Sequence, residues 1–203
     1  MALSPPPPRR APARGGWLGP VAVLVPVKAF AQAKVRLAPA LSPAHRAELA
    51  RTMAEGVLRG AGGLPAAVVC DDREVADWAR KLGALVIWEP GRGLNGAVAA
   101  GVSYLGAAGV NQVVVAAGDL PLAGDLGWIT EFDGITIVPD RRHDGTNVIS
   151  VPTKHLFSFS YGPGSFSRHL AEAQTLAMPI RVVPASPLGW DVDVPSDLSA
   201  LGS

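Results

Sequence analysis

Residues 21–25 read Val-Ala-Val-Leu-Val, and residues 112–117 read Gln-Val-Val-Val-Ala-Ala. Short apolar runs of this kind, rich in β-branched side chains, are typical of strands that are buried on both faces of a sheet. Both stretches therefore predict buried strands. Similar runs predict further strands at 66–70, 84–88, 135–138, 148–151 and 180–183.

Helical patterns separate most of these strands. Ser42-Pro43 has the residue types of a helix N-cap and a first helical position, and apolar residues then recur every four positions toward Arg59. Strands that alternate with helices predict an α/β protein with a three-layer, mostly parallel sheet and helices on both faces. Ligands of such sheets bind beyond the carboxyl ends of the strands. Further helices are predicted at 73–81, 95–108 and 165–175.

Length and composition bound the class of protein. The 203 residues suffice for one domain, and a formal net charge of +1 gives no support for nucleic-acid binding. No apolar run approaches the roughly 20 residues that cross a bilayer, so no membrane association is expected. The single cysteine, Cys70, excludes a disulfide framework. We expect a cytoplasmic globular protein, whose oligomeric state the sequence does not indicate.

Residues 1–20 differ from the rest of the chain. They hold four consecutive prolines, three arginines and no acidic residue. Such a segment cannot bury enough apolar surface to fold alone. The sequence therefore predicts a disordered Pro/Arg-rich tail at 1–20 and a single folded domain at 21–203.

Three cations follow the first predicted strand within nine residues: Lys28, Lys34 and Arg36. They are expected at the ligand-binding edge of the sheet, where they could neutralise a polyanion such as a triphosphate. Arg36 could offer a bidentate fork to a phosphate group. The alternative interpretation is an ordinary solvated basic loop.

Acidic residues are expected at the same edge. Gly118-Asp119-Leu120-Pro121 places a carboxylate directly after a buried strand, in a turn that proline restricts. Asp191 and Asp193 would point to the same face of an extended segment, because side chains alternate with period two. Carboxylates gathered in this way suit Mg²⁺, which prefers oxygen ligands and shares them with substrate phosphates. The alternative for the Asp191/Asp193 pair is a turn or cap.

Two glycine-containing segments are further candidates. Asp144-Gly-Thr146-Asn precedes a predicted strand, and Tyr161-Gly162-Pro-Gly-Ser165-Phe precedes a predicted helix. A glycine-rich loop that enters a helix presents free N–H groups to an anion, with Ser165 at or near the N-cap. An ordinary turn and cap would give the same pattern.

Residues 91–96 read Gly-Arg-Gly-Leu-Asn-Gly and match the G-x-G-x-x-G pattern of dinucleotide-binding loops. Glu89-Pro90 separates this loop from its strand, which is the third in the chain, and both features disfavour NAD binding. A loop near a nucleotide base or ribose, or a simple connection, fits better.

Taken together, these motifs and their order resemble one known family, the guanylyltransferases of coenzyme F-420 biosynthesis, over about residues 21–198. Members act on 2-phospho-L-lactate or phosphoenolpyruvate. The resemblance implies the nucleotidyltransferase (GT-A-like) fold and GMP transfer from GTP to a phosphorylated three-carbon acid, with release of pyrophosphate. The carrying motifs are Pro-Val-Lys28, Ala-Lys34-Val-Arg36-Leu, Gly118-Asp119-Leu-Pro, Asp144-Gly-Thr146-Asn, Tyr-Gly162-Pro-Gly-Ser165-Phe and Asp191-Val-Asp193-Val-Pro-Ser-Asp-Leu.

The resemblance also implies roles for individual residues. At matching positions, the aspartates are magnesium ligands, the cations hold the triphosphate, and the glycine-loop residues contact the acceptor. We expect Asn95 to contact guanine. The Ala-, Gly-, Pro- and Arg-rich composition suggests a GC-rich bacterial genome, which favours phosphoenolpyruvate as acceptor. The sets are Asp119, Asp191 and Asp193 for metal, Lys28, Lys34 and Arg36 for triphosphate, and Thr146, Gly162 and Ser165 for acceptor.

Three other functions stay open at this point. One is another GTP-dependent nucleotidyltransferase, such as a molybdenum-cofactor guanylyltransferase. A second is a glycosyltransferase, because Asp191-Val-Asp193 is formally a D-x-D pair. A third is a nucleotide-binding domain without catalytic activity.

Overall fold

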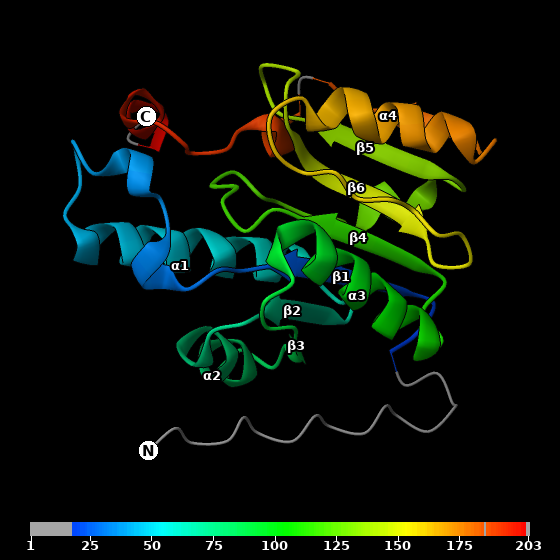
Figure 1. Cartoon of the computed structure of the whole chain (residues 1–203), viewed down its shortest axis with the longest axis horizontal. Helices are drawn as coiled ribbons and strands as arrows, with labels where there is room; N and C mark the ends of the chain where they lie inside the picture. The colour runs from blue at the N-terminus through cyan, green and yellow to red at the C-terminus, as the bar shows by residue number, and fades with distance from the viewer. Residues whose placement is uncertain (1–17, 185, 202–203) are drawn as a thin grey trace.

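A seven-stranded sheet forms the centre of the computed structural model, which describes residues 18–184 and 186–201 (Figure 1). The strand order is β3-β2-β1-β4-β6-β5-β7, so β1 and β4 are neighbours near the middle. The strands are β1 Val21–Pro26, β2 Ala66–Cys70, β3 Leu85–Trp88, β4 Gln112–Ala116, β5 Ile135–Pro139, β6 Thr146–Pro152 and β7 Ile180–Val182.

The prediction of a mostly parallel sheet is confirmed, with β6 as the reversed strand. β1 pairs in parallel with β2 and β4, β2 with β3, and β5 with β7. β6 is antiparallel to both β4 and β5. The reason is the short connection at 140–145, which is long enough for a hairpin but far too short for a crossover between parallel strands.

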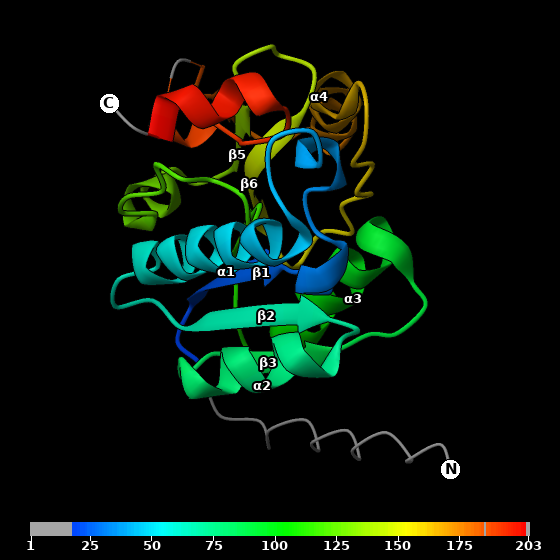
Figure 2. The same cartoon turned by 90° about the vertical axis from the view of Figure 1, so that its left-hand side faces the viewer.

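Helices cover both faces of the sheet, which confirms the three-layer prediction. Core contacts place α3 and α4 on one face, and α1 and α2 on the other (Figure 2). No helix in the described part of the chain is both long and apolar enough to cross a membrane. The helices are α1 Pro43–Gly60, α2 Arg73–Lys81, α3 Gly93–Ala107 and α4 Ser165–Thr175.

The small residues of α3 allow this helix to pack closely on β1. A Cβ atom placed on Gly101 would lie 2.7 Å from Cδ2 of Leu24, a side chain that is fully buried. Since interiors are close-packed, either Leu24 or the helix would have to shift. Glycine at position 101 therefore lets α3 lie close to β1, the strand that leads into residues 27–37.

The predicted N-terminal tail lies mostly outside the described residues, because the structure describes only its last three positions. Leu18 is buried in the core beneath α3, with 4% of its surface exposed. The carbonyl oxygen of Pro20 accepts hydrogen bonds from the N–H groups of Asn111 and Gln112, at 2.8 and 3.1 Å. Residues 18–20 thus belong to the packed fold.

Candidate active site

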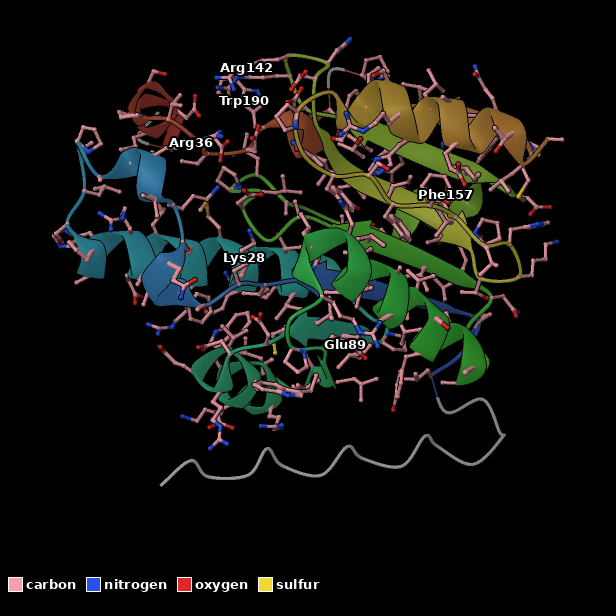
Figure 3. The ribbon with its side chains drawn as sticks, in the orientation of Figure 1. Lys28, Arg36, Glu89, Arg142, Phe157 and Trp190 are labelled. Atoms are coloured by element: carbon pink, nitrogen blue, oxygen red, sulfur yellow. The ribbon has the colours of Figure 1, made fainter. Side chains whose placement is uncertain are left out.

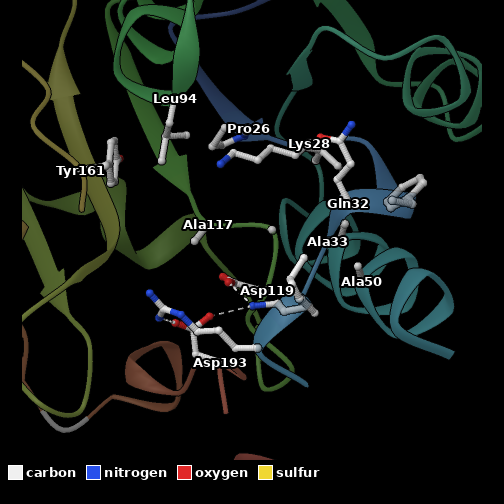
Figure 4. Close-up of a pocket in the computed structure, with 17 residues that line it drawn as sticks. Pro26, Lys28, Gln32, Ala33, Ala50, Leu94, Ala117, Asp119, Tyr161 and Asp193 are labelled. Atoms are coloured by element: carbon white, nitrogen blue, oxygen red, sulfur yellow. Dashed lines mark hydrogen bonds and ion pairs between the residues drawn. The ribbon is translucent and has the colours of Figure 1, made fainter. Parts of the chain in front are cut away.

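A cavity of about 540 Å³ opens beyond the carboxyl ends of β1 and β4 (Figure 4). This is the edge at which the α/β topology predicts a ligand. Lys28 and Arg36 lie on one side of the molecule in Figure 3, and Phe157 lies toward the other. The charged side chains that line the cavity are Lys28, Lys34, Arg36, Asp119 and Asp193.

The cation loop after β1 contains two short 3-10 turns, η1 (Phe30–Gln32) and η2 (Val35–Leu37). Phe30 and Leu37 are buried and anchor the two turns in the core. Lys34 lies between the turns in the left-handed region, with φ 54° and ψ 38°. A non-glycine residue in this region stores strain of about 1–3 kcal/mol, and such strain is common at functional positions.

The Lys34 ammonium joins two carboxylates from distant parts of the chain. Its Nζ lies 2.5 Å from Oδ2 of Asp119 and 3.3 Å from Oδ1 of Asp193. Arg36 Nη1 lies 2.9 Å from the other oxygen of Asp193. Burial alone would lower the pKa of Lys34, but the two carboxylates outweigh burial and raise it. Lys34 is therefore firmly protonated in the folded protein.

Asp191 lies close to this ion-pair cluster. The N–H of Val192 donates to the carbonyl oxygen of Asp119 at 3.4 Å, so the loop at 191–193 runs beside the end of β4. Burial and the negative charge of Asp119 raise the pKa of the Asp191 carboxyl. Among residues 18–184 and 186–201, no hydrogen-bond donor reaches its buried Oδ1 atom.

The residues present fit a divalent cation in their chemistry. Carboxylate oxygens are the ligands that Mg²⁺ prefers, and a buried oxygen without a donor is one that a cation would satisfy. Lys34 lies between Asp119 and Asp193 in this structure. Accordingly, no three His, Cys, Asp or Glu side chains of the described residues are spaced as a metal site. Magnesium binding stays a prediction.

The glycine segments are held together by Asp144. Its Oδ1 accepts from the Gly164 N–H at 3.0 Å, and its carbonyl oxygen accepts from the Phe166 N–H at 3.0 Å. Gly164 precedes α4 with φ 72°, which is a conformation suited to glycine. The loop at 161–165 therefore docks onto the β5–β6 hairpin.

Comparison with known families decides the classification. The sequence profile described as "Guanylyl transferase CofC like" matches residues 21–201, nearly the whole described chain. The chain belongs to this family. As a CofC-like protein, it is a nucleotidyltransferase enzyme, which agrees with the cation and carboxylate cavity at the end of the sheet.

Curated relatives carry two related names. A phosphoenolpyruvate guanylyltransferase from Rubrobacter xylanophilus is 36% identical over 190 residues, which are 89% of this chain and 93% of the relative. Another from Sphaerobacter thermophilus is 33% identical over 88% of this chain and 90% of the relative. A 2-phospho-L-lactate guanylyltransferase from Methanocaldococcus jannaschii is 27% identical over 88% of this chain and 81% of the relative.

Solved structures show the same fold at lower sequence identity. A nucleotidyl transferase from Methanothermobacter thermautotrophicus has a TM-score of 0.63 at 19% identity, with 89% of this chain and 95% of that chain covered. A 2-C-methyl-D-erythritol 4-phosphate cytidylyltransferase from Thermus thermophilus has a TM-score of 0.56 at 16% identity, covering 88% and 95%. The predicted nucleotidyltransferase fold is confirmed.

The predicted site residues of the CofC-like chain fall into two sets. The cavity brings together the three predicted cations and two of the three predicted metal ligands, with Asp191 beside them. Asn95 does not line the cavity, but its Oδ1 accepts from the N–H of Tyr161, which does, at 2.6 Å. Gly162 follows Tyr161, which lines the cavity beside Leu94 (Figure 4).

Thr146 and Ser165 are placed differently from the expectation of a direct acceptor contact. Ser165 has 2% of its surface exposed, and Thr146 has 5%. The Thr146 hydroxyl is hydrogen-bonded to Nδ1 of His169 at 3.0 Å. Neither residue lines the cavity. Their role toward an acceptor stays a prediction.

Asp197 supports the loop at 191–193. The sequence analysis did not predict it as a site residue. Its Oδ2 accepts from the N–H groups of Asp193 and Val194, at 2.8 and 2.9 Å. Its Oδ1 pairs with Arg141, which also donates to the Asp191 carbonyl oxygen at 3.2 Å. Burial would raise the pKa of Asp197, but these donors lower it overall. The sequence signal for this residue was its place as the last aspartate of the motif Asp191-Val-Asp193-Val-Pro-Ser-Asp-Leu.

His169 supports the cavity wall through Tyr161. The two rings meet edge to face, with centroids 4.9 Å apart. His169 Nε2 accepts from the Ser160 N–H at 2.9 Å, which leaves Nδ1 to donate to Thr146. Burial lowers the pKa of His169 to about 4. His169 is therefore an interior histidine whose two ring nitrogens are both hydrogen-bonded.

His169→Gln should change how stability depends on pH. In the wild type, the unfolded chain binds a proton at this histidine below about pH 6.5, whereas the folded chain resists protonation to about pH 4. The free energy of unfolding should therefore decrease as the pH is lowered from about 6.5 to about 4, by up to about 1.4 kcal/mol per pH unit for this proton. The variant should lack this component in urea unfolding curves. Equal pH slopes for the two proteins would contradict the assignment.

Proposed function

We propose that this chain transfers GMP from GTP to phosphoenolpyruvate and releases pyrophosphate. The observation that carries the proposal is the cavity in which Lys28, Lys34 and Arg36 face Asp119 and Asp193 at the end of the sheet. The names of the relatives with 33% and 36% identity favour phosphoenolpyruvate over 2-phospho-L-lactate as acceptor. As in the wider family, the product would enter coenzyme F-420 biosynthesis.

The chemistry of the cavity suits a phosphate nucleophile. The acceptor phosphate is already ionised near neutral pH, so its oxygen can attack the α-phosphorus of GTP without a general base. The bond from the α-phosphorus to the bridging oxygen breaks, and pyrophosphate leaves with the electron pair. Lys28, Lys34 and Arg36 would bind the triphosphate and stabilise the charge that develops on pyrophosphate. Positioning and electrostatics then supply most of the rate enhancement, as in phosphoryl transfer.

The carboxylates at the cavity would hold Mg²⁺ in the working enzyme. Asp119 and Asp193 line the cavity, and Asp191 brings an oxygen without a donor among the described residues. When bound, the ion would neutralise phosphate charge and act as a Lewis acid at the α-phosphoryl group. Arg141 and Asp197 keep the loop at 191–193 in place for this purpose.

An acceptor panel tests the proposal. The purified chain is mixed with GTP, Mg²⁺ and one acceptor at a time, and pyrophosphate release is followed continuously. We expect release with phosphoenolpyruvate, weaker release with 2-phospho-L-lactate, and none when ATP replaces GTP or when the acceptor is left out. Release that requires a sugar phosphate or a molybdenum-cofactor precursor instead would contradict the proposed substrate class.

A further inference from the structure

The Lys34 side chain occupies the position between carboxylates that a metal ion would need. Only 9% of the side chain is exposed, and its ammonium contacts both Asp119 and Asp193. Arg36 pairs with the remaining oxygen of Asp193, although 73% of its own side chain is exposed. Two of the three proposed metal ligands are therefore already neutralised by cations of the same chain.

These cations have two incompatible tasks in the proposed reaction. The proposed function assigns Lys34 and Arg36 to the triphosphate and assigns Asp119 and Asp193 to the metal. The Lys34 ammonium has three N–H donors and one positive charge, and it already contacts Asp119 and Asp193, so a triphosphate that binds it competes with these carboxylates. Arrival of the nucleotide would therefore weaken the ion pairs that now hold Lys34 against Asp119 and Asp193.

The backbone of the loop is consistent with such an exchange. Lys34 has φ 54° between η1 and η2, a conformation that costs energy for a residue with a Cβ atom. The adjacent Val35 is 63% exposed, so the side chain next to Lys34 is not packed into the core. The ion pairs to Asp119 and Asp193 are the contacts of the Lys34 head group that offset this strain.

We propose that Lys34 is an internal counter-ion that competes with the divalent cation for Asp119 and Asp193 until a triphosphate draws it away. The inference rests on the proposed function. Its consequence is that the metal binds weakly to the free protein, so that metal and nucleotide enter together. Such coupling between two ligands typically changes affinity by 5- to 150-fold, about 1–3 kcal/mol. Lys34 would neutralise the charges of Asp119 and Asp193 while the cavity holds no substrate.

Binding of Mn²⁺ to the protein without nucleotide tests this directly. Electron paramagnetic resonance counts free Mn²⁺, so no catalytic turnover is involved. Lys34→Met removes the ammonium but keeps the length of the side chain, and we expect it to bind Mn²⁺ about 10-fold more tightly than the wild type. Equal or weaker Mn²⁺ binding by this variant would overturn the proposal.

Lys28→Met is the matched control. Lys28 lines the same cavity, but it lies across the cavity from Asp193 in Figure 4, and within the described residues it forms no ion pair with either carboxylate. We expect its Mn²⁺ affinity to equal that of the wild type within the error of the titration. An equal gain for both variants would show a general effect of cavity charge and would overturn the specific role of Lys34.

Two further variants keep the proposal testable if Lys34→Met fails to fold. Arg36→Gln changes a mostly exposed side chain and frees one oxygen of Asp193, so it should tighten Mn²⁺ binding by about threefold. Lys34→Arg keeps a cation in place and should bind Mn²⁺ as weakly as the wild type. Tight binding by Lys34→Arg, or no change with Arg36→Gln, would contradict the competition.

The outcomes separate this inference from the proposed reaction. If Lys34→Met binds Mn²⁺ more tightly but the wild type releases no pyrophosphate with any acceptor, then the counter-ion role stands and the proposed reaction fails. If no variant binds Mn²⁺, then the counter-ion role fails even when pyrophosphate is released.

Discussion

Asp119→Asn should lower the rate of GMP transfer by at least about 10²-fold, the scale of losing one key electrostatic group in an active site. The carboxylate lies three positions beyond the end of β4, and its Oδ2 is 2.5 Å from Nζ of Lys34, so the ion pair holds it in place. Asparagine keeps the shape but removes the negative charge. Because a neutral amide is a weaker ligand for Mg²⁺, the loss should appear in turnover and should not be restored by more GTP.

Asp133→Asn is the matched control for this experiment. Asp133 is an exposed aspartate in the turn before β5, so the same chemical change occurs away from the cavity. We expect unchanged transfer in this variant. Circular dichroism should show that both variants are folded. Near-normal transfer by folded Asp119→Asn would remove Asp119 from the catalytic account.

Asp191→Asn should have opposite effects on stability and on activity. The buried Oδ1 of Asp191 has no donor among the described residues, and the carboxylate faces the negative charges of Asp119 and Asp193. Burial is the larger cost of this charge and repulsion the smaller, so removing the charge should raise the free energy of unfolding by about 1 kcal/mol. For a chain of this size, that corresponds to about 2–4 °C in Tm. Transfer should nonetheless fall by about 10²-fold.

Thermal melts and pyrophosphate release on the same preparation check both effects. Stabilised but less active variants are the expected result where a site keeps like charges together for function. The thermal melts are recorded without added divalent cation, and the rates are measured with Mg²⁺. A variant that is both less stable and fully active would contradict the assignment of Asp191 to the charge cluster.

Much of the fold was predictable because local patterns agreed with the tertiary structure. The helix at 165–175 and the strand at 66–70 have the predicted bounds. The β6 strand extends to Thr146–Pro152, beyond the predicted 148–151, because pairing on both sides with β4 and β5 orders residues that the apolar run alone does not reveal. The two 3-10 turns after β1 were missed, since three-residue turns carry no periodicity.

The candidate site was predictable where function follows from position at a strand end. Lys34 and Asp119 each follow a buried strand, and parallel pairing of β1 with β4 brings these strand ends side by side. Ion pairs between the cations and the carboxylates were not predicted, because the cations had been assigned to the triphosphate and the carboxylates to the metal ion. The contact of Arg141 with Asp197, 56 positions apart, and the burial of Ser165 depend on tertiary packing that no local motif records.

The mass of the product formed from GTP and phosphoenolpyruvate in the presence of Mg²⁺ tests the central claim most directly. We expect one product in which the GMP unit is joined through a diphosphate to the three-carbon acid, with pyrophosphate formed in equal amount. Formation of GDP or inorganic phosphate without this conjugate would contradict the proposed reaction. It would show that the protein acts on a phosphorus atom of GTP other than the α-phosphorus.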